Sequence, residues 1–208
     1  MKILITAGPT REPIDAVRYI SNRSSGRVGL ALAAAAIEGG HDVTVLLGPG
    51  VADQKLRGRC DVYRFGSSAE LQQLLDAHFG GCELLIMAAA VSDYRPAAVC
   101  GGKLPRQSGQ RMRLDLEPTP DLVAQCAAAK RPGQRIIAFA LEEADNLEVR
   151  AAEKLMRKGI DGIVANPLGT MESDSITAVY LAGDGSRVAP GRMSKTVFAQ
   201  WLIERITL

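Results

Sequence analysis

Short apolar runs alternate with longer segments of helical periodicity along most of the chain. Three runs, Lys2–Ala7, Asp42–Leu47 and Glu83–Ala90, are almost continuously hydrophobic, which is typical of parallel strands covered on both faces. Between the first two, Gly26–Glu38 is predicted to form a helix that ends at the following Gly-Gly pair. This order predicts an α/β fold with a Rossmann-like, doubly wound, mostly parallel sheet and helices on both faces.

The same alternation continues through the rest of the chain. Further strands are predicted over Val62–Phe65, Met112–Leu116, Arg135–Leu141, Gly162–Asn166 and Thr177–Ala182. Further helices are predicted over Ser68–His78, Thr119–Ala129, Asp145–Lys158 and Lys195–Ile206. The segment Ser92–Gln110 is rich in Gly, Pro and basic residues, which predicts a long flexible active-site loop. No linker divides the chain, so we expect one domain over residues 1–208.

Composition excludes several kinds of protein. With 25 basic and 23 acidic residues the net charge is only +2, and aromatic residues make up 4%, so we expect no binding to nucleic acid. The two histidines and four scattered cysteines lack the spacing of a metal site. The amino terminus is too short an apolar segment for a signal peptide or a membrane span, so we expect a cytoplasmic protein without membrane contact.

The loop after the first strand carries the first candidate chemistry. Arg18 and Asn22 lie in it, and Ser24-Ser25-Gly26 opens the next helix, where free amides and the helix dipole suit a phosphate or carboxylate. The alternative is that Ser24 or Ser25 only caps the helix. No Gly-x-Gly-x-x-Gly fingerprint stands here, which disfavours a standard NAD or FAD site.

A second group of candidates follows the third apolar run. Ala88 and Ala89 are small enough for a ligand to approach the backbone, and Asp93 could accept a hydrogen bond from a base or ribose, although it could equally be a turn residue. Lys103 is a charge of the kind used on polyphosphates, although such lysines are more often solvated.

Two helices offer further candidates. The amides after Pro120 begin a helix near a strand end, where they could meet a phosphate or a base edge. Lys154 and Lys158 share one helix face and could point at a triphosphate, or could form a solvated stripe. Phe139 lies inside a predicted strand and is by default a core residue.

Three motifs together resemble a known enzyme family. The segments ITAGPTREPIDAVRYISNRSSGRVG, IMAAAVSDYRP and TPDLV are similar to those of the phosphopantothenoylcysteine synthetases, also called phosphopantothenate-cysteine ligases. The resemblance runs from Ile3 to the C-terminal helix and is of the bacterial type. Bacterial members are often fused behind a flavin-dependent decarboxylase, whereas this chain starts at the synthetase strand, so we expect a stand-alone ligase.

The resemblance implies a reaction of coenzyme A biosynthesis. The carboxylate of 4'-phosphopantothenate would attack the α-phosphate of CTP to form an acyl-cytidylate and pyrophosphate, and the amine of L-cysteine would then displace CMP to form an amide. Mg²⁺ is the implied ion, a homodimer the implied assembly, and a separate decarboxylase a potential partner. Eukaryotic relatives use ATP, and the residues here do not decide between the two nucleotides.

The resemblance also implies roles for particular residues. Lys103 and Asn22 would be catalytic, the first stabilising charge on the triphosphate and the second processing the acyl-nucleotide. Arg18 falls on an arginine linked to the family's dimer interface, near the phosphopantothenate site. The nucleotide would be bound by Gly8, Ser24, Gly26, Met87, Ala88, Ala89, Asp93, Lys103, Pro120, Asp121, Leu122, Val123, Phe139, Lys154 and Lys158.

The chain departs from the bacterial pattern at a few positions. Pro105 and Arg106 replace lysines that follow the family's first loop lysine, and Pro167 replaces the aspartate of an Ala-Asn-Asp motif. These prolines keep open a second hypothesis, a non-catalytic nucleotide-binding partner of a decarboxylase. A third hypothesis, an NAD-linked reductase, is disfavoured because the chain lacks a Tyr-x-x-x-Lys pair.

Overall fold

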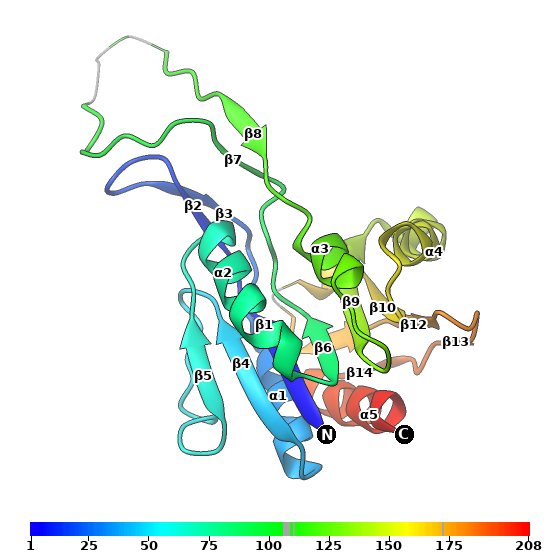
Figure 1. The fold of residues 1–208 in the computed structure, drawn as a ribbon. Coiled ribbons are helices and arrows are strands. Elements are labelled where there is room, and N and C mark those ends of the chain that lie inside the picture. Colours follow the sequence, from blue (N-terminus) through cyan, green and yellow to red (C-terminus); the bar gives the residue numbers. More distant parts are fainter. Residues whose placement is uncertain (106–108, 110, 172) are drawn as a thin grey trace.

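The computed structural model describes residues 1–105, 109, 111–171 and 173–208. At its centre lies an eight-stranded sheet in the order β13-β12-β10-β9-β6-β1-β4-β5 (Figure 1). The strands from β10 to β5 pair in parallel, and β12 and β13 add an antiparallel edge. The bounds of these strands are β1 Lys2–Ala7, β4 Asp42–Leu47, β5 Asp61–Arg64, β6 Leu84–Met87, β9 Arg135–Glu142, β10 Gly162–Pro167, β12 Val179–Ala182 and β13 Arg187–Val188.

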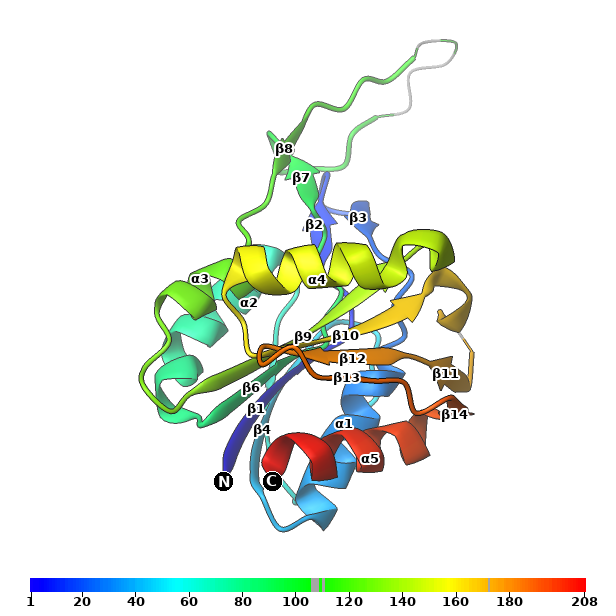
Figure 2. The same ribbon diagram turned by 90° about the vertical axis from the view of Figure 1, so that its right-hand side faces the viewer.

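Helices cover both faces of the sheet. α1 (Arg27–Glu38) and α5 (Lys195–Thr207) lie side by side on one face, while α2 (Ser68–His78), α3 (Leu122–Ala128) and α4 (Leu147–Lys158) lie on the other (Figure 2). Successive residues of β1 enter opposite cores, Ile3 and Ile5 the core with α1 and α5, and Leu4 the core with α2, α3 and α4. Burial on both faces explains the unbroken apolar runs of the central strands.

The doubly wound fold predicted from the hydrophobic pattern is therefore confirmed. β1, β4 and α2 begin and end where the sequence predicts, because a continuous apolar run or a serine cap marks each boundary. The described residues also form three short 3₁₀ helices, η1 Phe79–Gly81, η2 Ala144–Asn146 and η3 Leu168–Thr170. The pattern did not predict η1 and η3, and it assigned most of η2 to the start of the helix expected over Asp145–Lys158. Among the described residues, no helix is both long and apolar enough to cross a membrane.

Several predicted boundaries are wrong. The strand expected over Met112–Leu116 is β8, Leu116–Pro118, and the strand expected over Thr177–Ala182 is interrupted at Ala178. Its first part, β11 (Ser175–Thr177), pairs instead with β14 (Arg192–Ser194) in a separate two-stranded sheet. Pairing with a distant segment decides these cases, and a local apolar pattern does not contain that information.

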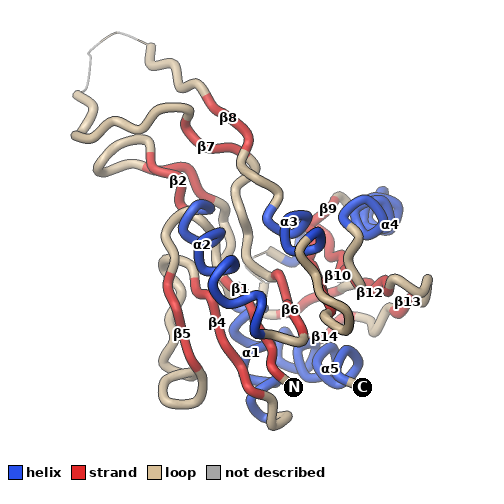
Figure 3. Tube along the Cα trace, viewed as in Figure 1, coloured by secondary structure: helices blue, strands red, loops and turns tan. Residues whose placement is uncertain are grey.

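Two antiparallel pairs project from the carboxyl edge of the sheet. β2 (Arg11–Pro13) pairs with β3 (Tyr19–Ser21), and β7 (Tyr94–Pro96) pairs with β8. We call residues 11–21 and 94–118 together the arm, of which 106–108 and 110 lie outside the described residues. Figure 3 shows the part around β7 and β8 as largely loop and standing away from the main sheet, whereas β2 lies against α2, where Ser68 donates hydrogen bonds to the buried Glu12 carboxylate. The loop predicted after β1 thus contains a hairpin.

Candidate active site

The two central strands, β1 and β6, end next to each other at the carboxyl edge. The chain leaves them for opposite faces of the sheet, and this arrangement opens a crevice where ligands bind in doubly wound folds. Beyond the strands, Pro9 pairs with Ala90, and Gly8 C=O accepts a hydrogen bond from Ala90 N–H at 2.9 Å. Gly8 has φ 88°, and a Cβ there would lie 2.7 Å from Val51 Cγ2, so this tight exit requires glycine.

A cavity of about 570 Å³ occupies this crevice. The segment before α1, the end of β6, the middle of β9, the end of β10 and the first residue of α5 all contribute to its wall. Its described lining consists of Ser21, Asn22, Arg23, Ser24, Ser25, Gly26, Arg27, Val28, Gly29, Ala88, Ala89, Ala90, Val91, Asp93, Phe139, Ala140, Leu141, Lys154, Asn166, Thr170, Met171, Ile176 and Lys195.

The cavity brings together about half of the residues predicted from the sequence. Those that line it are Asn22, Ser24, Gly26, Ala88, Ala89, Asp93, Phe139 and Lys154. Those that do not line it are Gly8, Arg18, Met87, Lys103, Pro120, Asp121, Leu122, Val123 and Lys158. Phe139 is only partly buried and reaches the cavity, so its default assignment to the core is incomplete.

The amino terminus of α1 faces the cavity without a side-chain cap. Gly26 stands at the N-cap with φ 70°, and Ser24 Oγ accepts a hydrogen bond from Gly26 N–H at 3.3 Å instead of one from within the helix. The first helical bond runs from Leu30 N–H to Gly26 C=O, at 3.0 Å. The amides of the first turn therefore remain available, which favours the anion-binding interpretation of this segment over the capping one.

Asn22 and Asp93 are held in place from opposite sides of the crevice. Asn22 Nδ2 donates to Ala90 C=O at 3.0 Å, which fixes the amide against the end of β6. The backbone C=O of Asp93 accepts from Thr119 N–H at 2.9 Å, so the segment entering α3 lies beside it. Pro120 to Val123 thus lie next to the cavity without lining it.

Next to the cavity, two buried hydroxyl groups connect the loop after β1 to the segment after β6. Thr10 Oγ1 donates to Ser92 Oγ at 3.2 Å and accepts from Ser92 N–H at 3.1 Å. Ser21 Oγ donates to Thr10 C=O at 2.7 Å. This network fixes the backbone on both sides of Asn22 and Asp93, and composition gave no signal for it.

The two lysines of α4 both have acidic partners. Lys154 Nζ lies 2.5 Å from Glu142 Oε1, and Lys158 Nζ lies 2.9 Å from Asp121 Oδ1. Burial alone would raise the pKa of Asp121, but hydrogen bonds from Lys158 and the Ala124 amide outweigh it and lower that pKa. The alternative of a solvated stripe therefore does not describe these two lysines, and of the two only Lys154 lines the cavity.

On the arm, Arg18 and Lys103 belong to one structure. The Asp15 carboxylate accepts hydrogen bonds from the Arg18 guanidinium and from the amides of Val17, Arg18 and Leu104, and these bonds hold its pKa well below the usual range. Arg18 Nη2 donates to Leu104 C=O at 2.9 Å. Lys103 is exposed beside this anchored residue, whereas Arg106 lies outside the described residues.

Arg18 and Leu104 also line a second, larger cavity. It has about 1030 Å³ and lies between the two halves of the arm. Its wall belongs to the arm alone, so it shares no described residue with the cavity at the sheet edge. Arg18 therefore does not join the other candidates at the crevice.

Sequence reasoning missed several polar residues of the sheet-edge cavity, among them Arg27, Asn166, Thr170 and Lys195. Asn166 and Thr170 come from the end of β10 and η3, with Asn166 Nδ2 donating to Thr170 Oγ1 at 2.6 Å. Arg27 and Lys195 open α1 and α5. Arg27 lies within the first of the three motifs without being singled out there, and Lys195 belongs to none of them. Their approach depends on how α5 packs beside α1, which only the tertiary fold reveals.

The cavity contains little that could hold a metal ion through protein groups alone. Asp93 is the only acidic residue in its described lining. No group of three or more His, Cys, Asp or Glu side chains is placed to hold a metal within the described residues. A single carboxylate suits Mg²⁺ only when phosphate oxygens and water complete its coordination.

Comparisons with known proteins place this geometry in a family. The chain is 42% identical over 167 residues (80% of its length) to a cysteine/cysteine sulfinic acid decarboxylase of an unknown prokaryotic organism, and 37% identical over 213 residues (99%) to the coenzyme A biosynthesis bifunctional protein CoaBC of Escherichia coli K12. It spans 46% and 51% of those proteins, about half the length of the curated relatives.

A solved structure extends the match to three dimensions. The crystal structure of the C-terminal domain of a coenzyme A biosynthesis bifunctional protein CoaBC superposes with a TM-score of 0.82 at 30% identity, covering 99% of this chain and 93% of that one. The family model for the DNA/pantothenate metabolism flavoprotein C-terminal domain matches residues 1–208. The chain belongs to this family.

Proposed function

We propose that the chain is a phosphopantothenate-cysteine ligase acting in coenzyme A biosynthesis. The observation that carries the proposal is the cavity at the end of β1 and β6, which joins an uncapped helix terminus, Asn22 and Asp93 in one crevice. The similarity to CoaBC proteins over nearly the whole chain supports the same assignment. Residues 1–208 would act as one domain.

The proposed first step activates a carboxylate. A carboxylate oxygen of 4'-phosphopantothenate attacks the α-phosphorus of CTP, the bond to the β-phosphate oxygen breaks, and pyrophosphate leaves. Amides of the α1 terminus would hold phosphate oxygens, and small residues at Ala88 and Ala89 would let the nucleotide approach the backbone. Lys103 would stabilise negative charge as it develops on the triphosphate.

The proposed second step forms the amide. The amine of L-cysteine attacks the acyl carbon, the bond to the phosphate oxygen breaks, and CMP leaves while the nitrogen loses its proton to solvent. One N–H of Asn22 is engaged by Ala90 C=O, and the amide group carries a second N–H that could donate to the acyl oxygen. No histidine is needed, because the nucleotide is already a good leaving group.

The proposal extends to the metal ion, the nucleotide, the assembly and the location. Mg²⁺ would be held by the nucleotide phosphates with Asp93, and when bound it would neutralise phosphate charge. CTP is favoured over ATP by the bacterial character of the motifs. We also propose a homodimer and a cytoplasmic location, the latter because all four cysteines are free thiols.

One assay tests the activity. The protein is incubated with 4'-phosphopantothenate, cysteine, Mg²⁺ and either CTP or ATP, and pyrophosphate and the amide product are measured. We expect pyrophosphate and product with CTP. The absence of pyrophosphate with both nucleotides would contradict the ligase assignment, and nucleotide binding without product would favour a non-catalytic partner of a decarboxylase.

Single-residue variants test which residue acts in each of the two steps. Lys103→Gln removes a charge used only on the triphosphate, so we expect a loss of about 10²-fold in turnover. Asn22→Asp removes the amide donor, and we expect the acyl-nucleotide to form and persist, as detected by mass spectrometry. Lys55→Gln, an exposed lysine outside the cavity, is the matched control and should keep full turnover.

A further inference from the structure

Lys195, the first residue of α5, is a buried lysine in the wall of the sheet-edge cavity. Its side chain lines the sheet-edge cavity and the residue is only 9% exposed. Within the described residues, its ammonium group has no hydrogen bond and no ion pair, whereas the nearby Arg27 is paired with Asp174 at 2.6 Å. Lysines this buried are normally paired, because an unpaired charge loses its hydration.

The surroundings of Lys195 are positively charged. Burial lowers the pKa of Lys195 and the positive charge of Arg27 lowers it further, while Asp174 acts in the opposite direction. Asp174 is itself exposed to solvent and already engaged by Arg27. The cavity wall therefore presents more positive charge than its described acidic neighbours neutralise, and an anion would relieve this imbalance.

The uncapped terminus of α1 contributes to the same wall. Residues 24–29 line the cavity, Gly26 provides no side-chain cap, and no acidic residue stands in the first turn. The first residue of α5 meets this segment because α5 packs alongside α1 (Figure 2). By contrast, α5 has its own cap, since Ser194 Oγ accepts from Val197 N–H at 3.2 Å. Free amides and a buried ammonium group thus converge from two helices.

We propose that Lys195 and the α1 terminus form a phosphate subsite, in which Lys195 donates to a phosphate oxygen and the α1 amides hold the others. The inference rests on the proposed function for the identity of the substrates, and it adds a binding residue that no motif assigned. The phosphate belongs to the nucleotide or to 4'-phosphopantothenate, since both carry the same chemistry.

Binding measurements with variants test the subsite. Calorimetric titrations with CTP, with 4'-phosphopantothenate and with inorganic pyrophosphate are run on the wild-type chain, Lys195→Met and Lys195→Arg. We expect Lys195→Met to weaken pyrophosphate and at least one substrate by about 10- to 100-fold, the effect of a lost charge-assisted hydrogen bond. The substrate that is weakened identifies the source of the phosphate. Lys195→Arg should recover part of the affinity.

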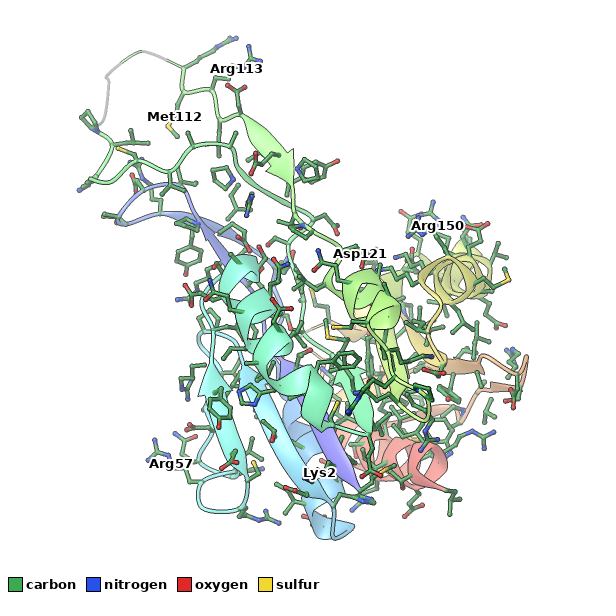
Figure 4. The ribbon with its side chains drawn as sticks, viewed as in Figure 1. Lys2, Arg57, Met112, Arg113, Asp121 and Arg150 are labelled. Carbon is green, nitrogen blue, oxygen red and sulfur yellow. The ribbon has the colours of Figure 1, made fainter. Side chains whose placement is uncertain are left out.

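Stability separates a binding role from a structural one. Removing an unpaired buried charge should leave the melting temperature of Lys195→Met equal to or above that of the wild type. Lys2→Met is the matched control, because Lys2 lies at the opposite end of β1 (Figure 4), and it should bind all three probes normally. Unchanged affinities in Lys195→Met, or an equal loss in Lys2→Met, would overturn the subsite.

The test of the subsite can be distinguished from the test of the ligase activity. Amide formation by the wild type together with binding that does not depend on Lys195 would overturn the subsite and leave the proposed function intact. Binding that depends on Lys195, in a wild type that forms no amide with either nucleotide, would overturn the proposed function and leave the subsite intact.

Discussion

Glu142 illustrates how burial decides the importance of a single charged residue. It ends β9 with a side chain only 6% exposed, and Lys154 and Arg150 of α4 approach it at 2.5 and 3.6 Å. Glu148, also on α4, makes a bidentate pair with Arg187 at 2.6 Å, but that side chain is 44% exposed. Both pairs have good geometry, so they differ mainly in access to water.

This difference predicts unequal costs of removing the two carboxylates. Glu142→Gln places a neutral amide, in a side-chain position that is only 6% exposed, opposite Lys154 and Arg150, so we expect a loss of about 1–3 kcal/mol in the free energy of unfolding. Glu148→Gln should cost at most about 1 kcal/mol, because water replaces the lost partner. Urea unfolding at pH 7 measures both, and equal costs would contradict the role given to burial.

At the level of elements, hydrogen bonds to one turn, rather than a hydrophobic core, hold the two halves of the arm together. The turn between β2 and β3 carries Asp15, whose carboxylate holds Arg18 and the Leu104 amide together. Backbone bonds reinforce this link, from Cys100 N–H to Ile14 C=O at 3.1 Å and from Ala16 N–H to Gly102 C=O at 3.4 Å. Asp15 is thus a positioning residue for the segment that carries Lys103.

Asp15→Asn tests this link between the two halves of the arm. The variant loses the negative charge that strengthens the bonds from Leu104 N–H and Arg18, so we expect the Leu104 amide to exchange its hydrogen about tenfold faster or more. Turnover should fall because Lys103 is less well placed, while CTP affinity changes little. Asp115→Asn, which loses only an exposed pair with Arg113, is the control. Unchanged exchange at Leu104 would contradict the link.

On the scale of the whole molecule, the sequence predicts the strands and helices that have a local hydrophobic pattern or cap. It does not predict pairings between segments that are far apart along the chain. The central strands and α2 were found because each signals its own burial or cap. The β2–β3 hairpin was missed because its strands have three residues each and one contains Pro13. The pairing of Lys158 with Asp121 depends on how α3 and α4 meet.

In the candidate site too, residues within local motifs were predicted, and residues brought in by distant packing were not. Residues in contiguous motifs, such as Asn22 and Asp93, were predicted to lie at strand ends, and the fold brings them to one crevice. Lys195 lies in the first turn of a helix far along the chain, with a serine cap as its only local signal. Nothing in that turn indicates a cavity, because the cavity exists only where α5 packs beside α1.

The arm also bears on the assembly of the whole molecule. Large apolar side chains along it are 46% to 60% exposed, namely Val17, Tyr19, Tyr94, Val99, Met112 and Leu116. Arg18 lies between the first two of them, and Figure 4 shows Met112 on the part of the arm that stands clear of the sheet. Exposed apolar groups gathered on one projection are typical of a protein interface, and this supports a homodimer formed through the arm.

Two double variants test that assembly. In the first double variant, the charges of Val99→Asp and Met112→Asp would have to be buried between two copies of the arm. We therefore expect this variant to be a monomer in sedimentation experiments at micromolar concentration, and we expect the wild type to be a dimer there. Val149→Asp and Met156→Asp place the same charges on α4, where the side chains are 62% and 75% exposed, and this control should remain a dimer. A monomeric wild type would contradict the dimer, and a dimeric arm variant would place its interface elsewhere.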